Sequence, residues 1–284
     1  KRISAFDNTT FCTAFLSDGS LLTIRDIPIV DLRDVDKIAF NPTGSSLALM
    51  RGKKPVSIYS FRDRNKKLFE LKEQRKSKEL KGRKNLNFFV PGPVGAELMK
   101  DASKGDIVPV AMCYGADARN FLVSNSLGEI IVYDTKAYLP QAYIQGKAVA
   151  TAITMSPNNY FIAAGTGKNI DIWNFQTKEL RTSLPMPAEV TELVFSADAS
   201  QMAVVTADKR LTIFDTKTWD KVDIFDKIGG TLTSPSFHPD GKYISVVKDG
   251  NAIVIMNLKN SVPEQTLDEN PGGVTGSRFF VNKQ

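Results

Sequence analysis

A phrase of about 41 residues recurs along the chain, and this repeat constrains the fold more than any other feature. Each phrase opens with an aromatic or large apolar residue, enters a turn containing Pro, Asp, Asn or Gly, and continues with an apolar run. The clearest opening residues are Tyr114, Met155, Phe195, Phe237 and Phe279, separated by 41, 40, 42 and 42 residues. Pro fixes φ at an early turn position, and Asp, Asn and Gly close the turn. Each phrase therefore predicts a strand, a tight turn and a second strand.

A third predicted strand follows each turn and ends in a large side chain followed by Asp or Asn. The four clear endings are Tyr133-Asp134, Trp173-Asn174, Phe214-Asp215 and Met256-Asn257. A weaker fourth strand follows, as in residues 141–144 and 222–225. Four short strands per repeat are typical of a propeller blade, so we predict an all-β fold of four-stranded antiparallel blades.

One repeat carries a family resemblance. Residues 237–241 (Phe-His-Pro-Asp-Gly), followed by residues 255–257 (Ile-Met-Asn), resemble a divergent repeat of the WD40 family. The resemblance is strong over residues 110–284 and moderate over residues 1–60. Members of that family usually carry a Gly-His pair and a buried hydrogen-bond network that needs histidine in many blades. This chain has one histidine, so the resemblance implies a WD40-like propeller, and no family site residues are carried over.

The number of blades depends on how the first half of the chain is divided. The length of 284 residues corresponds to about seven repeats. Phe40 and Tyr114 are 74 residues apart, which allows either two compressed blades or one blade with an insertion. We predict seven blades with one degraded, and six blades with a basic insertion is the alternative. Residues 1–284 would form one domain, and ring closure would join residues 2–26 to residues 274–281.

Positive charge is concentrated in one segment. The net charge is +6, and residues 62–84 hold eleven basic and four acidic residues, so the rest of the chain is nearly balanced. This basic excursion is either a solvated loop or a contact for an anionic partner. The candidate partner-binding residues are Arg64, Lys66, Lys67, Lys72, Arg75, Lys76, Lys78, Lys81, Arg83 and Lys84.

The expected partner is a protein or peptide, and an acidic face on it would suit the basic excursion. A membrane surface and nucleic acid are the other anionic partners that this charge allows. Nucleic acid is disfavoured because Phe69 is the single aromatic residue interleaved with the basic ones.

Residues that could carry chemistry have simpler structural interpretations. His238 is the single histidine and lies in a predicted turn. The recurring carboxylates are expected to cap turns by accepting backbone N–H groups, and they are Asp117, Asp134, Asp198, Asp215 and Asp240. Asp36 and Glu192 precede repeat-opening residues, where carboxylates of different blades could meet. Residues 165–168 (Gly-Thr-Gly-Lys) lack full phosphate-loop spacing and predict a hairpin turn, and Trp173 is expected to be a core residue.

We assign no catalytic residue, metal ligand or cofactor from the sequence. Cys12 and Cys113 are far apart and are expected to be small buried apolar residues, with a single bridge between them as the alternative. No apolar run is long enough to span a membrane, so we expect a soluble protein and a monomer. The compartment stays open, either cytoplasmic or exported with a signal removed.

Two functions follow from these features. The first is a non-enzymatic platform that binds a protein or peptide. The alternative is a hydrolase or lactonase of the propeller type that uses channel carboxylates and a metal ion. The single histidine and the local role expected for most Asp residues favour the platform.

Overall fold

The computed structural model describes residues 12–15, 21–24, 35–43, 45–60, 67–71, 107–226, 228–268, 274, 276, 277 and 279. They belong to two compact units, one of residues 29–185 and one of residues 1–28 with 186–284. Regular structure in these ranges consists of β-strands, as predicted, and no helix in them is long and apolar enough to cross a membrane.

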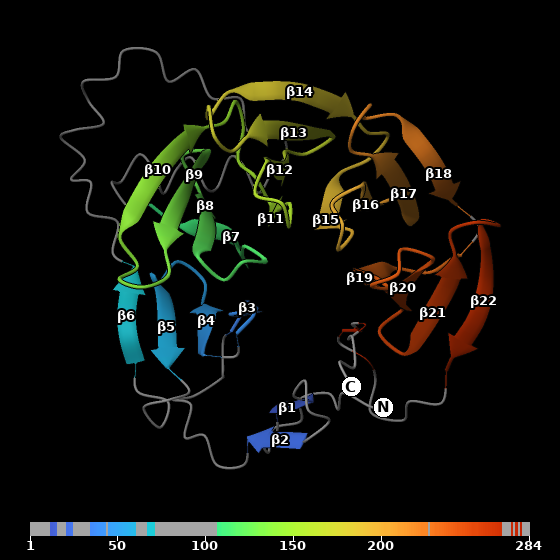
Figure 1. The fold of residues 1–284 in the computed structure, drawn as a ribbon, viewed down its shortest axis with the longest axis horizontal. Helices are drawn as coiled ribbons and strands as arrows, with labels where there is room; N and C mark the ends of the chain where they lie inside the picture. Colours follow the sequence, from blue (N-terminus) through green and yellow to red (C-terminus); the bar gives the residue numbers. More distant parts are fainter. Residues whose placement is uncertain are drawn as a thin grey trace. The chain divides into compact units, whose positions relative to one another are not determined.

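The unit of residues 29–185 contains three four-stranded antiparallel sheets. Their strands are β3 (Lys37–Phe40), β4 (Ser46–Met50), β5 (Val56–Ser60) and β6 (Lys67–Leu71); β7 (Pro109–Tyr114), β8 (Asn120–Asn125), β9 (Glu129–Asp134) and β10 (Pro140–Gln145); and β11 (Ala152–Met155), β12 (Phe161–Gly165), β13 (Asn169–Asn174) and β14 (Leu180–Pro185). Strands follow one another in chain order across each sheet, and the first strands β3, β7 and β11 are neighbours (Figure 1).

The other unit contains two further four-stranded sheets and a two-stranded one. The strands are β1 (Cys12–Phe15) and β2 (Leu21–Ile24); β15 (Val190–Phe195), β16 (Gln201–Thr206), β17 (Arg210–Asp215) and β18 (Lys221–Phe225); and β19 (Leu232–Phe237), β20 (Tyr243–Lys248), β21 (Ala252–Asn257) and β22 (Val262–Leu267). The first strands β15 and β19 pack together. Each four-stranded sheet is one propeller blade.

The predicted blade count is wrong for the part of the chain that the structure describes. Five four-stranded blades are present there, where the sequence predicted seven or six. Residues 12–24 contribute the two-stranded pair β1–β2 instead of a four-stranded blade. Residues 72–106, on which the seventh blade or the insertion depended, lie outside the described residues.

Burial follows the position of a strand within its blade. Second and third strands are covered on both faces, so β4 and β8 are buried along their whole length. Outer strands are covered on one face, and β14 alternates between half-buried and exposed residues. This explains why the inner parts of each repeat are continuous apolar runs and the fourth strand is weak in the sequence.

The turns repeat the same backbone geometry. The turn between first and second strands has one residue with positive φ, and so does the turn between third and fourth strands. These residues are Ala118, Asn159, Ala199 and Gly241 in the first turn, and Tyr138, Lys178, Trp219 and Ser261 in the second. Only one of the eight is glycine, so the blades hold ordinary side chains in a left-handed conformation that costs free energy when isolated.

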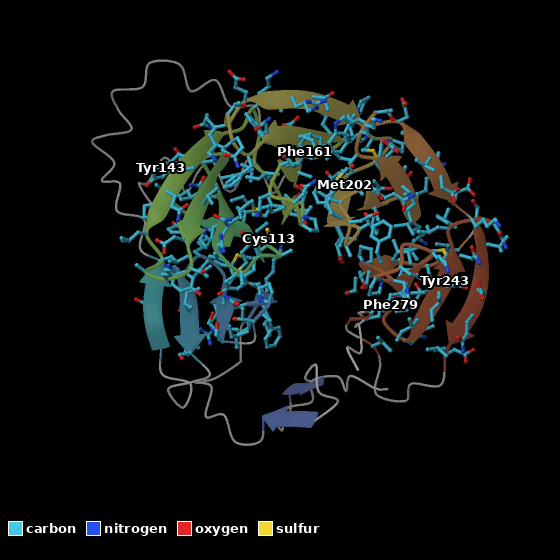
Figure 2. The ribbon with its side chains drawn as sticks, viewed as in Figure 1. Cys113, Tyr143, Phe161, Met202, Tyr243 and Phe279 are labelled. Atoms are coloured by element: carbon cyan, nitrogen blue, oxygen red, sulfur yellow. The ribbon has the colours of Figure 1, made fainter. Side chains whose placement is uncertain are left out.

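The last blade is covered along its first strand by residues near the C-terminus. The N–H of Phe279 donates to Ser236 Oγ at 3.2 Å, and its ring meets the imidazole of His238 edge-on with centroids 4.9 Å apart (Figure 2). Ser277 Oγ lies 3.1 Å from Ser245 Oγ. In the other unit, Met155 is the repeat-opening residue that corresponds to Phe279. It packs against Gly115, which corresponds to His238. Ring closure between residues 2–26 and 274–281 stays a prediction.

The outer strand of this last blade, β22, is less covered than the outer strands β10 and β18 of two other blades. Leu267 on β22 is 41% exposed, whereas the corresponding residues Ile144 on β10 and Phe225 on β18 are 1% and 4% exposed. Those two residues pack in core clusters that include the following blade. All six residues of β22 are exposed.

Candidate interaction surfaces

The basic segment chosen from the sequence cannot be placed. Lys67 opens β6, and of that residue the structure describes the backbone. The other nine candidate residues, from Arg64 to Lys84, lie outside the described residues. Their role in partner binding therefore stays a prediction.

The recurring carboxylates cap turns, as predicted. Asp134 Oδ1 accepts the N–H groups of Lys136 and Ala137, and Asp215 Oδ1 accepts those of Lys217 and Thr218. In the turns between first and second strands, the same role falls to Asp117, Asp198 and Asp240, which accept the N–H groups of Arg119, Ser200 and Lys242.

These hydrogen bonds lower the pKa of several of the capping carboxyls. The N–H of Ala137 is the main cause at Asp134, and the N–H of Thr218 is the main cause of the lowered pKa at Asp215. The hydroxyl of Ser196 is the main cause of the lowered pKa at Asp198. These groups are ionised at neutral pH and are held by local bonds, which suits turn formation and leaves no proton for acid catalysis.

The two carboxylates singled out as channel residues also bond to backbone. Glu192 Oε2 accepts the N–H of Ser234 at 2.9 Å, and Asp36 Oδ2 accepts the N–H of Gly52. The two residues belong to different units. Across the described ranges, no group of three or more His, Cys, Asp or Glu could hold a metal ion.

The other sequence candidates take structural positions. His238 lies in the turn after β19, with Nδ1 2.6 Å from Asp240 Oδ1. Residues 165–168 form the hairpin turn that was predicted, closed by the N–H of Thr166 donating to Asn169 O. Trp173 is buried in the core of the blades β7–β10 and β11–β14.

Cys113 is a free thiol on β7 (Figure 2). Desolvation by burial raises its pKa to about 12. A thiol with so high a pKa is a poor nucleophile at neutral pH, in keeping with the packing role that was expected. Of Cys12, the structure describes the backbone in β1.

Three exposed apolar side chains lie at one end of the blades of residues 29–185. We call this the Tyr160 end, and it comprises Phe40 with the turns at 41–43, 115–119, 135–139, 156–160 and 175–179. Among the described residues of this unit, four large hydrophobic side chains are exposed, and Tyr160 (58%), Leu139 (57%) and Phe40 (40%) lie at this end. The fourth, Tyr143, lies on the outer strand β10 (Figure 2).

Hydrogen bonds between blades hold the turns of the Tyr160 end together. Ser46 Oγ, at the start of β4, lies 3.0 Å from the hydroxyl of Tyr138, which precedes Leu139. Asn159, which precedes Tyr160, donates through Nδ2 to Asp117 Oδ2 at 3.0 Å. The three blades therefore present their turns on one surface.

Charged side chains also lie at this end. Arg119 and Lys136 are exposed in turns of the same blade, and the guanidinium of Arg181 lies 5.8 Å from the ring centre of Phe161. An exposed apolar set with a polar rim is the surface type of a protein interface.

The sequence analysis did not single out Phe40, Leu139 or Tyr160. A signal was available for Tyr160, because the other members of its turn, residues 156–159 (Ser-Pro-Asn-Asn), include no large apolar residue. Connecting turns lie mostly at the surface, so an apolar residue among polar ones is a candidate surface contact, although buried Tyr138 shows that a turn residue can also join the core.

Comparison with known proteins agrees with the fold. No family model matches the chain. The chain is similar to Periodic tryptophan protein 2 homolog of Dictyostelium discoideum, with 29% identity over 132 residues. The match covers 39% of this chain and 14% of that relative, so the chain corresponds to a small part of the relative's length.

The four-stranded blades, the repeat of about 41 residues and this similarity define a β-propeller protein. The chain is a divergent WD40-like β-propeller.

Proposed function

We propose that this chain is a non-enzymatic platform that binds a protein or peptide partner. The WD40-like fold and the similarity to a periodic tryptophan protein fit an interaction scaffold. The observation that carries the proposal is the Tyr160 end, where Tyr160 and Leu139 on turns and Phe40 at the end of β3 are exposed on three neighbouring blades.

The rigidity of these turns supports a binding role. Asp134 accepts two backbone N–H groups, and Asn158 Oδ1 accepts the N–H of Tyr160 itself. A side chain on a fixed turn loses little conformational entropy when a partner binds, and tyrosine is frequent among residues that dominate binding energy. A partner covering Tyr160 and Leu139 would bury apolar area now in water.

The hydrolase alternative has no support in the described residues. Asp36 and Glu192 each bond to a backbone N–H, and the recurring Asp residues cap turns. The finer part of the proposal adds Arg64 to Lys84 as contacts for an acidic face on the partner, and this part rests on their charge.

The test places a photoreactive amino acid at position 160 in cells that express the chain, with position 143 as the matched control. Both tyrosines are exposed, but Tyr143 lies on a strand away from the turns. We expect position 160 to capture a defined protein that position 143 does not, and Leu139→Asp to abolish that capture. Equal capture at both positions, or capture that survives Leu139→Asp in a folded chain, would contradict the proposal.

A further inference from the structure

The opposite end of the same three blades is rich in lysine. We call it the Lys37 end, and it comprises Lys37 with the connections at 51–55, 126–128, 146–151 and 166–168. Its exposed lysines are Lys37, Lys53, Lys54, Lys147 and Lys168. They come from three of these four connections and from the start of β3, so no single local sequence cluster explains them.

Strand register shows that these connections share one end of the sheets. Lys37 pairs with Met50, and Val56 pairs with Leu71, so β3 starts where β4 ends, β5 starts and β6 ends. The three blades meet at this end through Lys37, whose Nζ donates to Val110 O at 3.2 Å and to Thr151 O at 3.1 Å. The lysines therefore lie on one surface.

Carboxylates at the Lys37 end are few and are engaged within the protein. Asp36 accepts the N–H of Gly52. Asp171 is buried and accepts Ser183 Oγ at 2.6 Å and Thr166 Oγ1 at 3.3 Å. Glu129 is also buried, and Asn125 donates to it at 3.1 Å. Glu70, near the end of β6, is the other exposed carboxylate among the described residues there, and it too has an interaction within the protein.

The balance of exposed charges differs between the two ends of these blades. The Tyr160 end differs, because its exposed Arg119 and Lys136 accompany Asp117 and Asp134. Neighbouring strands are about 4.8 Å apart. Lys37, Lys53 and Lys54 belong to neighbouring strand ends of one blade and thus lie within roughly a Debye length of one another.

We propose that the Lys37 end binds an acidic segment, rich in Asp and Glu, of a protein partner; this rests on the proposed platform function. Lysine ammonium groups bind carboxylates without strict geometry, which suits a flexible acidic chain. Exposed large apolar side chains are missing from the described residues of this end. Single-stranded nucleic acid would need stacking residues, and a membrane surface would need residues to insert, so both fit less well.

The test measures binding of a fluorescent peptide of about 20 residues, mostly Asp and Glu, by anisotropy at low and high salt. The variant is Lys54→Glu/Lys147→Glu/Lys168→Glu in the full chain. The matched control is Lys217→Glu/Lys221→Glu/Lys259→Glu, which changes the net charge equally on exposed lysines of the other unit. Circular dichroism and thermal unfolding establish that both variants fold.

We expect the wild-type chain to bind the peptide, the variant to bind about tenfold more weakly, and the control to change less than about twofold. Absence of peptide binding, or equal weakening in both variants, overturns the proposal. Tighter binding of an oligonucleotide or of anionic vesicles than of the peptide overturns the class of partner.

The two proposals fail separately. If photo-crosslinking at position 160 persists while the peptide does not bind, the platform stands and the Lys37 end is not its acidic-partner site. If the peptide binds through the Lys37 end and crosslinking at position 160 fails, the Tyr160 end loses its role instead.

Discussion

The hydroxyl oxygens of Tyr114 and Tyr138 lie 2.9 Å apart, and Ser46 Oγ lies 3.0 Å from that of Tyr138. This cluster joins the blades β3–β6 and β7–β10. Burial raises the pKa of Tyr114 above its ordinary value, so its hydroxyl stays protonated.

Tyr138→Phe removes the central hydroxyl and keeps the ring that packs near Phe121. We expect the free energy of unfolding to fall by about 1 to 2 kcal/mol, because Ser46 and Tyr114 lose a buried hydrogen-bond partner. Urea unfolding measures this. Tyr160→Phe, at an exposed tyrosine, is the control and should change stability by less than about 0.5 kcal/mol. Equal effects of the two changes would show that the cluster is unimportant.

Asp134→Asn/Asp215→Asn should reduce the sensitivity of the fold to acid. The folded state lowers the pKa of both carboxyls, so their stabilising effect is present above the unfolded pKa of about 3.9 and is lost as pH falls below it. Asn174 and Asn257 make the same caps in sister blades, so the variant should fold normally at pH 7. Thermal unfolding from about pH 6 to pH 2 tests this, and an unchanged acid transition would contradict it.

Lys37→Met should loosen the three blades of its unit. The change removes the donor to Val110 O and Thr151 O but keeps most of the side-chain length. We expect the free energy of unfolding to fall by about 1 kcal/mol. The effect is smaller than for a buried hydrogen bond to a charged group, because Lys37 is exposed. Lys136→Met, in an exposed turn, is the control for urea unfolding. A loss no larger than that of the control would argue against the bridging role.

Cys113 should resist alkylation. With its pKa raised to about 12, reaction with iodoacetamide at pH 8 should be about a thousandfold slower than for an ordinary thiol. Mass spectrometry of the peptide that contains Cys113 follows the rate, and the same peptide in urea provides the reference. Fast labelling of the native protein would show that the thiol is more accessible than the structure indicates.

Phe279→Ala should destabilise the last blade. The half-buried ring of Phe279 contacts the imidazole of His238, so we expect its removal to lower the free energy of unfolding by about 2 kcal/mol. Hydrogen exchange should rise in β19 and β20 and stay unchanged in β8 and β9.

Chains that lack residues 2–26 test the proposed ring closure in the same assay. Unchanged exchange in β19 after that deletion would count against closure.

Local features were predictable from the sequence because they depend on neighbours in the chain. The turn after Phe237 follows from Pro, Asp and Gly at fixed offsets, and the cap at Asp134 follows from Asp at the end of a third strand. The third strands were predictable because both faces of a middle strand are buried, which leaves an apolar run. Trp173 lies in the core for the same reason.

Features that depend on contacts between blades were not predictable. Nothing in the local sequence of Lys37 indicates that its ammonium reaches Val110 and Thr151. The Ser46–Tyr138 contact joins residues 92 positions apart. The predicted blade count was wrong because the length of a chain does not show how many of its residues form paired strands. A blade needs four paired strands, and residues 12–24 supply two. The shared surface of Tyr160 and Leu139 was not predictable, because it depends on hydrogen bonds between different blades.

Among the described strands, the exposure of Leu267 marks β22 as the one most open to proteases. Its counterparts Ile144 and Phe225 are fixed by a following blade, while β22 is exposed along its length. A strand with little buried area detaches at small cost, so transient fraying should begin at β22 and spread toward β21. Among the described strands, limited digestion should then cut first between Ser261 and Asp268, and a partner that shields this edge would lengthen the lifetime of its unit.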